Sequence, residues 1–381
     1  MAIDSWFKIL SAINLVGAGH ALVQALLLVF SKRGNHPANR IMALFLTALA
    51  LGMANGFVNI LGWYSRWPVL SILIGSIILT YGPLFYFYVR TMSGGDFRWR
   101  LSRLGHFVPF LLGLAFWTAF WVFRRHEGLP GILGRCVGTP WLPVTLMAVV
   151  QMTAYVTLMI RCLREYARKV RDSFSSLDGI NLRWLKWRLA VFAVISVLGL
   201  AAVAAFKFDS RLVNVAGQVS FFLAALNIFA TGYRAMFQPR IFFGAGGEGG
   251  PGKRYQRSSL TAEGAGTLKT RLLDMMAREK PFLDPGLTLP KLARTLDVPV
   301  NHLSQVINEQ LGRNFFDFIN GYRVDAAKQQ LAQPGAAQLK LTSIAFDCGF
   351  NSLATFNRVF KDLAGRNPSD FRKNPTSLPP R

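Results

Sequence analysis

Long apolar stretches in the first 233 residues limit more than any other feature how this chain can fold. In lipid, only a helix or a closed barrel satisfies its own backbone hydrogen bonds, and a helix needs about 20 apolar residues to cross. We therefore expect an all-α chain with an N-terminal bundle of about seven transmembrane helices, six or eight being the alternatives. The expected spans are residues 9–30, 41–61, 69–89, 107–123, 141–160, 189–206 and 212–233, of which the fourth and sixth are short.

Lys and Arg in the loops set the expected orientation of this bundle, because their side chains resist translocation. If the N-terminus is outside, the inside loops hold fifteen Lys and Arg residues and the outside segments hold seven. This bias predicts an outside N-terminus and, with an odd number of spans, a cytoplasmic C-terminal half. The first stretch lacks a basic leader and a small-residue cleavage site, so we expect a retained span.

The composition joins two properties that ordinary soluble enzymes seldom share, 52% hydrophobic residues and a net charge of +24. From residue 253 onward there are 19 Lys and Arg residues and 11 Asp and Glu residues, which leaves a surplus of +8. Such a balance predicts membrane contact together with a polyanionic partner. The three cysteines are far apart and predict no disulfide or metal site, and no catalytic motif is present. We expect no enzyme activity, no cofactor and no metal.

Polar side chains inside the expected spans are candidates for a ligand site, because burying them in lipid is costly without a partner. The alternative is that these groups only bridge helices. No acidic residue lies well inside a span, which argues against a proton-coupled transporter. The candidate residues are His20, Gln24, Asn55, Asn59, Gln151 and Gln218.

A glycine-rich segment, residues 244–252, separates the two halves and has the composition of a flexible coil. We therefore expect a transmembrane sensor or anchor domain over residues 1–240 and a linker over 241–264. A second domain is expected over residues 265–375, followed by a tail over 376–381.

Helical periodicity replaces continuous apolarity after this linker. Thr288 is the expected N-cap of a short helix, and a turn at 297–299 leads to a second helix that ends at Gly312. The outer face of the second helix carries uncharged hydrogen-bonding side chains, of the kind that pair with adenine in the major groove. The alternative is an ordinary solvated face. These residues are Asn301, Ser304, Gln305 and Asn308.

The same layout recurs about 52 residues later, which predicts a second helix-turn-helix unit. Here Thr342 and Ser352 are the expected N-caps, and Cys348 is expected to be a small core residue. One long helix over residues 314–331 is expected to join the two units and to fix their separation. The expected DNA-binding residues of the second unit are Ser352, Leu353, Ala354, Asn357, Arg358 and Lys361.

Residues 343–350, 356–361 and 365–372, which read SIAFDCGF, FNRVFK and GRNPSDFR, resemble the AraC/XylS-type DNA-binding domain. The resemblance covers about residues 268–373. It implies base contacts from Asn301, Ser304 and Gln305 in the first unit. In the second unit it implies base contacts from Leu353, Ala354, Asn357 and Arg358, of which the first two are apolar where many relatives are polar.

The usual sugar-binding barrel of that family is absent, and a membrane bundle takes its place. Residues 82–90 and 238–242 resemble a membrane-bound subgroup, which implies the bacterial inner membrane as the location. The sequence thus predicts a membrane-anchored one-component transcription regulator. The expected partners are double-stranded DNA, membrane lipid, a second copy of the chain, and an unknown small-molecule or envelope signal.

Two rival functions stay open. In the first, a protease releases the soluble half by cutting near residues 244–257. In the second, the chain is a transporter or membrane enzyme with an appended DNA-binding regulatory domain.

Overall fold

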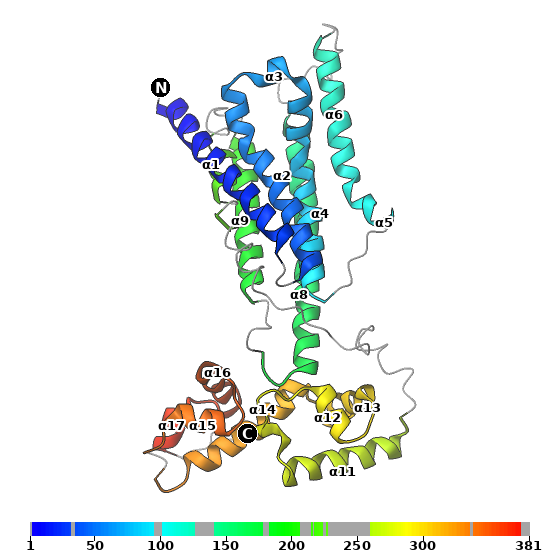
Figure 1. Ribbon diagram of the computed structural model, residues 1–381, viewed down its shortest axis with the longest axis vertical. Helices are drawn as coiled ribbons and strands as arrows, with labels where there is room; N and C mark the ends of the chain where they lie inside the picture. The colour runs from blue at the N-terminus through cyan, green and yellow to red at the C-terminus, as the bar shows by residue number, and fades with distance from the viewer. Residues whose placement is uncertain are drawn as a thin grey trace. The chain divides into compact units, whose positions relative to one another are not determined.

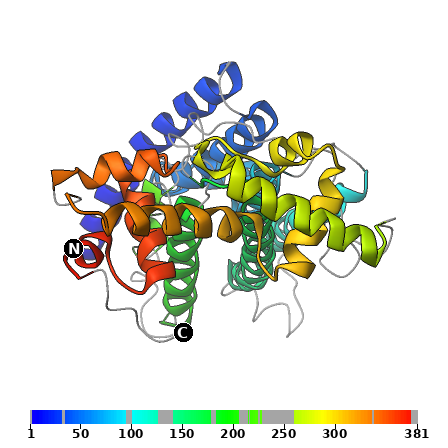
Figure 2. The same cartoon turned by 90° about the horizontal axis from the view of Figure 1, so that it is seen from below.

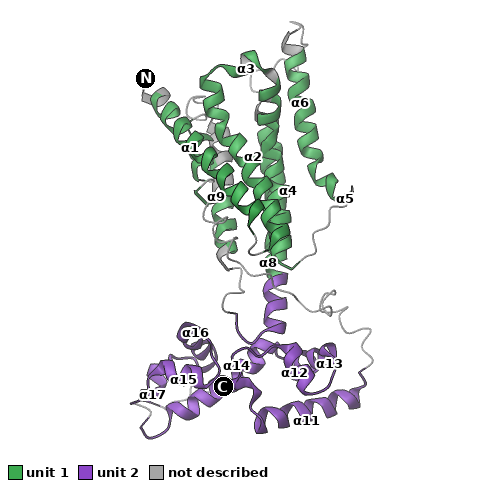
Figure 3. Ribbon diagram, viewed as in Figure 1, with its two compact units in different colours: residues 1–164, 182–240 green, residues 165–181, 241–381 purple. Residues whose placement is uncertain are grey.

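The computed structural model describes residues 2–31, 35–94, 101–125, 141–177, 183–205, 215, 217–223, 226–227, 260–335 and 338–374. Within these residues every named element is a helix, which confirms the all-α prediction (Figure 1). The glycine-rich linker at 244–252 lies outside the described residues. Two compact units are present, Met1–Arg164 with Leu182–Arg240, and Glu165–Asn181 with Ile241–Arg381 (Figure 3).

Long helices that pack on one another build the first unit. Helix α1 lies against α2, α2 against α4, and α4 against α6. The helices are α1 (Ala2–Phe30), α2 (His36–Ile60), α3 (Trp63–Arg66), α4 (Pro68–Met92), α5 (Leu101–Leu104), the 3₁₀ turn η1 (Gly105–Phe107), α6 (Val108–Arg125), α8 (Trp141–Ser173) and α9 (Arg183–Ala205).

Five helical segments among the described residues are long and apolar enough to cross a membrane. They match the first five predicted spans, but a bundle of seven transmembrane helices is not shown. Helix α9 covers most of the sixth predicted span and is not among the five, and the seventh falls largely on residues outside the description. The five segments are Ser5–Phe30, His36–Ile60, Ile72–Met92, Ser102–Val122 and Pro143–Ser173.

Large apolar side chains on these helices remain exposed. Val16 is 76% exposed on α1, Val150 is 71% exposed on α8, and Trp187 is 73% exposed on α9. Exposed apolar side chains on several membrane-length helices suit a region that is covered by lipid or by another protein. The exposure is therefore a second hint, besides helix length, that this unit lies in a membrane.

Two helix-turn-helix units at the ends of one connecting helix, α14 (Phe315–Leu331), make up most of the second unit (Figure 2). Each has its own hydrophobic core. The other elements are α11 (Ala262–Arg278), η2 (Pro281–Leu283), α12 (Leu289–Thr295), α13 (Val300–Gln305), the π-helical turn η3 (Val306–Gln310), α15 (Leu341–Asp347), α16 (Leu353–Ala364) and α17 (Pro368–Lys373).

Two of the three predicted N-caps are confirmed. The side chain of Thr288 accepts a hydrogen bond from the Lys291 backbone N–H, and that of Ser352 accepts one from Thr355. The prediction for Thr342 is wrong, because α15 already begins at Leu341 and its N-cap is Lys340, which makes no side-chain cap. Leu341 packs against the second core, so tertiary contact decides where this helix begins.

Cys348 is fully buried in the second core, as predicted. Burial raises the pKa of its thiol from the ordinary 9.0 to about 11, and the Asp347 carboxylate adds to the shift. The folded state therefore keeps a proton that the unfolded chain releases. Below about pH 9 the thiol is protonated in both states, and between pH 9 and pH 11 only the unfolded chain releases the proton, so the folded state loses stability over this range.

We therefore expect the second core to lose stability between pH 9 and pH 11. This loss should be smaller in Cys348→Ala than in the wild type. Protease sensitivity of residues 341–374 in the full chain measures the population of the open form. Equal pH dependence in the two proteins would contradict the assignment to this thiol.

Candidate DNA-binding surface

The turn between α12 and α13 depends on one residue with a left-handed backbone. Asp297 has a φ of 53°, an uncommon value for a residue other than glycine. Its backbone N–H donates to the carbonyl of Arg294, and that of Val298 donates to Ala293. The Arg271 guanidinium on α11 also donates to the Leu296 carbonyl at 2.7 Å, which anchors the end of α12. These bonds fix the direction in which the first recognition helix leaves the turn.

Three of the four residues predicted for the first recognition helix are accessible. Asn301 is exposed, while Gln305 and Asn308 are half-buried. The Gln305 amide donates to the Glu309 carboxylate at 2.8 Å. The two residues are four positions apart, a spacing that allows this contact on a helix, but it is not among the sequence predictions.

Ser304 corrects the predicted exposed stripe, since this residue is only 4% exposed. It lies three residues before Ile307 and seven before Leu311, so helical periodicity places it towards the apolar side. The Asn308 amide donates to the Ser304 carbonyl at 2.8 Å and to its hydroxyl at 3.3 Å. In this structure Ser304 therefore orients Asn308 and does not present its own side chain to solvent.

The second recognition helix, α16, offers a more exposed set. Ala354, Asn357, Arg358 and Lys361 are exposed, and Gly365 with a φ of 76° ends the helix. The Arg358 guanidinium lies 3.9 Å from the Asp362 carboxylate, one turn later. Leu353 is half-buried and packs against the second core, so part of its apolar surface is already used in the fold.

The connecting helix α14 belongs to both cores. Phe315, Phe318 and Ile319 contribute to the first core, and Phe316 and Val324 to the second. The predicted long helix is confirmed, and different residues of it contribute to the two cores.

Arg323, in the middle of α14, is 1% exposed and was not singled out in the sequence. Its Nε donates to the Phe282 carbonyl at 2.7 Å, and its Nη2 donates to the Asp284 carbonyl at 2.8 Å. Burial lowers the pKa of the guanidinium to about 10, while the Asp284 carboxylate acts in the opposite direction. Arg323 thus joins the connecting helix to the loop before α12, and no local pattern distinguishes it from a solvated arginine.

The predicted ligand candidates in the first unit separate into two groups. The amides of Gln218 and Gln151 take part in contacts between distant segments. The Asn14 amide donates to the Gln218 side-chain oxygen at 2.7 Å, and the Gln151 amide donates to the Leu79 carbonyl at 3.0 Å. His20 and Asn59 are exposed, Asn55 is half-buried and Gln24 is buried. The bonds of Gln151 and Gln218 favour bridging between helices over ligand binding.

One open pocket of about 280 Å³ includes Gln151 together with His106 and Tyr155. The His106 Nδ1 lies 2.7 Å from the Tyr155 hydroxyl. These two residues come from different helices, so no local spacing in the sequence points to their contact. Among the described residues, no group of three or more His, Cys, Asp or Glu side chains could hold a metal ion.

Comparison with known proteins supports the reading of the second unit. A family model described as a helix-turn-helix domain matches residues 292–374, which include both turns and α14. The C-terminal part of the chain is an AraC-type helix-turn-helix domain.

The relatives of the AraC-type domain are regulators by name. The HTH-type transcriptional regulator GlxA of Rhizobium meliloti is 30% identical over 118 residues, which are 31% of this chain and 35% of GlxA. The uncharacterized HTH-type transcriptional regulator YtdP of Bacillus subtilis is 32% identical over 92 residues, 24% of this chain and 12% of YtdP. The chain therefore spans about a third or less of these relatives.

A solved structure of a protein of unknown function from Listeria innocua is also similar. It is 31% identical, covers 27% of this chain and 93% of its own length, and has a TM-score of 0.25.

Proposed function

We propose that the chain is a membrane-anchored one-component transcription regulator. In this proposal the helical bundle lies in the bacterial inner membrane with the N-terminus outside. The AraC-type domain lies in the cytoplasm, where its two recognition helices read a specific DNA sequence. The observation that carries the proposal is that one chain contains both a double helix-turn-helix domain and, among its described residues, five membrane-length helices.

Chemistry of the accessible side chains supports DNA as the ligand. Asn301, Gln305 and Asn357 are amides that can pair with adenine, and Arg358 can pair with guanine. The surplus of positive charge from residue 253 onward favours phosphate contacts, which should make the affinity depend on salt. A dimer would double the number of base contacts, since a tandem of two units reads a short site.

The bundle supplies the anchor and, in this proposal, the sensor. Its exposed apolar side chains suit a lipid environment, and the fifteen Lys and Arg residues of the expected inside loops favour a cytoplasmic DNA-binding domain. The inducing signal is an unknown small molecule or an envelope component.

Cell fractionation together with genome-wide mapping of bound DNA tests this function. We expect the full chain in the salt-washed membrane fraction, with enrichment of a recurrent DNA motif that a variant ending at residue 252 does not enrich. An intact chain in the soluble fraction would contradict the anchor, and a soluble C-terminal fragment that accumulates on induction would favour proteolytic release. The absence of any enriched motif would contradict sequence-specific reading.

A further inference from the structure

Helix α8 has residues in both compact units. It is one continuous helix, Trp141–Ser173, and the division between the units falls within it, after Arg164. The residues that follow, up to Leu177, belong with the AraC-type domain although they are far from it in sequence. We call Arg171–Leu177 the strap.

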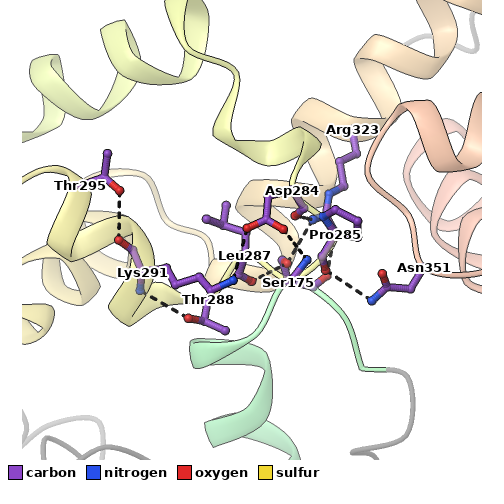
Figure 4. Close-up of polar contacts among 10 residues, drawn as sticks. Ser175, Asp284, Pro285, Leu287, Thr288, Lys291, Thr295, Arg323 and Asn351 are labelled. Carbon is purple, nitrogen blue, oxygen red and sulfur yellow. Dashed lines mark hydrogen bonds and ion pairs between the residues drawn. The ribbon is translucent and has the colours of Figure 1, made fainter.

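The strap lies along the loop that precedes α12. Phe174 and Thr288 form an antiparallel β-bridge. The Ser175 hydroxyl donates to the Leu287 carbonyl at 2.6 Å (Figure 4). The Ser175 backbone N–H donates to the same carbonyl at 3.4 Å. Ser175 is 1% exposed, so this contact is an interior part of the unit.

Ser175 also accepts hydrogen bonds from the connecting helix. The Arg323 Nη1 donates to the Ser175 carbonyl at 3.2 Å, and Nη2 donates to its hydroxyl at 3.1 Å. The Asn320 amide donates to the same carbonyl at 3.0 Å. Asn320 and Arg323 are 0% and 1% exposed, so loss of the strap would leave buried donors without these acceptors. The strap is therefore built into the polar centre of the domain.

The two ends of the strap reach further parts of the domain. The Arg171 guanidinium lies 3.1 Å from the Asp317 carboxylate and 5.4 Å from the centre of the Phe316 ring. Leu177 packs against the second core. The strap thus touches the loop of the first helix-turn-helix unit, the connecting helix and the core of the second unit.

We infer that the strap is the element through which the membrane bundle controls DNA reading. This inference rests on the proposed function and names its regulation. With the strap engaged, the two helix-turn-helix units keep the arrangement that reads an operator, and a signal that shifts α8 withdraws the strap and loosens them. The contacts described for the strap involve none of the residues predicted to touch bases, so its engagement leaves those residues available.

A later connection between the halves, which includes residues 244–252, lies outside the described residues. Its sequence, GAGGEGGPG, has a composition that predicts no rigid element. Helix α8 is continuous as far as Ser173, two residues before Ser175, so a movement along its length is passed to the strap. Coupling between a signal and DNA then needs only that the signal favours one of two strap positions.

Cross-linking tests whether the strap is engaged in the full chain. Partners in an antiparallel bridge have Cα atoms about 4.5–5.5 Å apart, within the range of a disulfide. We expect Phe174→Cys with Thr288→Cys to form a disulfide under mild oxidation. A protease site inserted at 244–252 reveals the bond, because the two halves then stay together after cleavage until a reductant is added. Each single-cysteine variant is the control, and separation of the halves in the double variant would overturn the inference.

DNA affinity of the full chain tests the regulatory role. Ser175→Ala should bind the mapped operator about tenfold more weakly at fixed salt, within the usual range of coupling between sites, whereas Ser173→Ala, at the end of α8, should bind as the wild type does. Equal affinities of all three proteins would overturn the regulatory role. If the wild type itself prefers no duplex, the proposed function fails instead, and the cross-link still reports on the strap.

A charge exchange separates regulation from misfolding. Arg171→Asp and Asp317→Arg should each weaken operator binding, and the double variant should recover part of the affinity because it restores an ion pair of opposite sense. Asp317 also accepts a bond from the Asn314 amide at 2.6 Å, so its single variant carries an additional cost. If the double variant bound the operator no more tightly than the weaker-binding single variant, the result would argue against the Arg171–Asp317 contact as part of the strap.

Discussion

Arg358→Ala should lower the affinity of the full chain for its operator by about ten- to a hundredfold at fixed salt, because one base contact corresponds to about 1–3 kcal/mol. Arg358 is exposed on α16, and its partner Asp362 at 3.9 Å is also exposed, so DNA can displace this ion pair. The loss should concern specific binding, since the side chain is proposed to read a base. Titration of labelled operator and of a scrambled duplex measures both affinities.

Lys361→Ala, on the same helix, is the matched control for charge. If Lys361 contacts a phosphate, its loss should weaken binding to operator and scrambled duplex alike, and should reduce the salt dependence by about one counterion. If Arg358→Ala kept the wild-type preference for the operator over the scrambled duplex, this result would refute the base-reading role of the second unit.

Phe356→Ala should destabilise the second helix-turn-helix unit by about 3–5 kcal/mol, the usual cost of removing a fully buried aromatic ring. Phe356 is 0% exposed and makes edge-to-face contacts with Phe350 and Phe360, at centroid distances of 5.2 and 5.6 Å. Because the stability of a whole domain is of the same order, this change should open α16 for a measurable fraction of the time. Operator binding should fall with it.

Leu363→Ala is the control within the same helix, since Leu363 is 47% exposed and its truncation leaves no cavity. Amide hydrogen exchange of the full chain, resolved to residues 353–364, measures the free energy of opening. Protection that is equal in the two variants would mean that the second core is not organised around Phe356.

Local pattern was sufficient for several parts of the domain. The caps Thr288 and Ser352, the buried Cys348 and the helix from Phe315 to Leu331 followed from spacing and side-chain type alone. Each of these features depends on residues within a few positions of one another, so a single sequence contains the necessary information.

Predictions from local sequence were wrong or incomplete where residues distant in sequence decide burial or the start of a helix. Ser304 was assigned to the exposed face, yet it is buried and is bonded by Asn308. Thr342 was assigned as a cap, yet the packed Leu341 starts the helix one residue earlier. Polar side chains at the edge of an apolar stripe are ambiguous until the packing is known.

The amino-acid sequence alone determined that this chain has membrane-length apolar helices and, after a glycine-rich segment, two helix-turn-helix units with polar outer faces. Periodicity and length contain that information. Only the tertiary structure decided that Ser175 meets Arg323, 148 residues away in sequence. A buried guanidinium needs several acceptors at once, and the fold collects them from the strap, from Asn320 and from the loop at Phe282 and Asp284. No spacing in the sequence indicates that Ser175 and Arg323 are in contact.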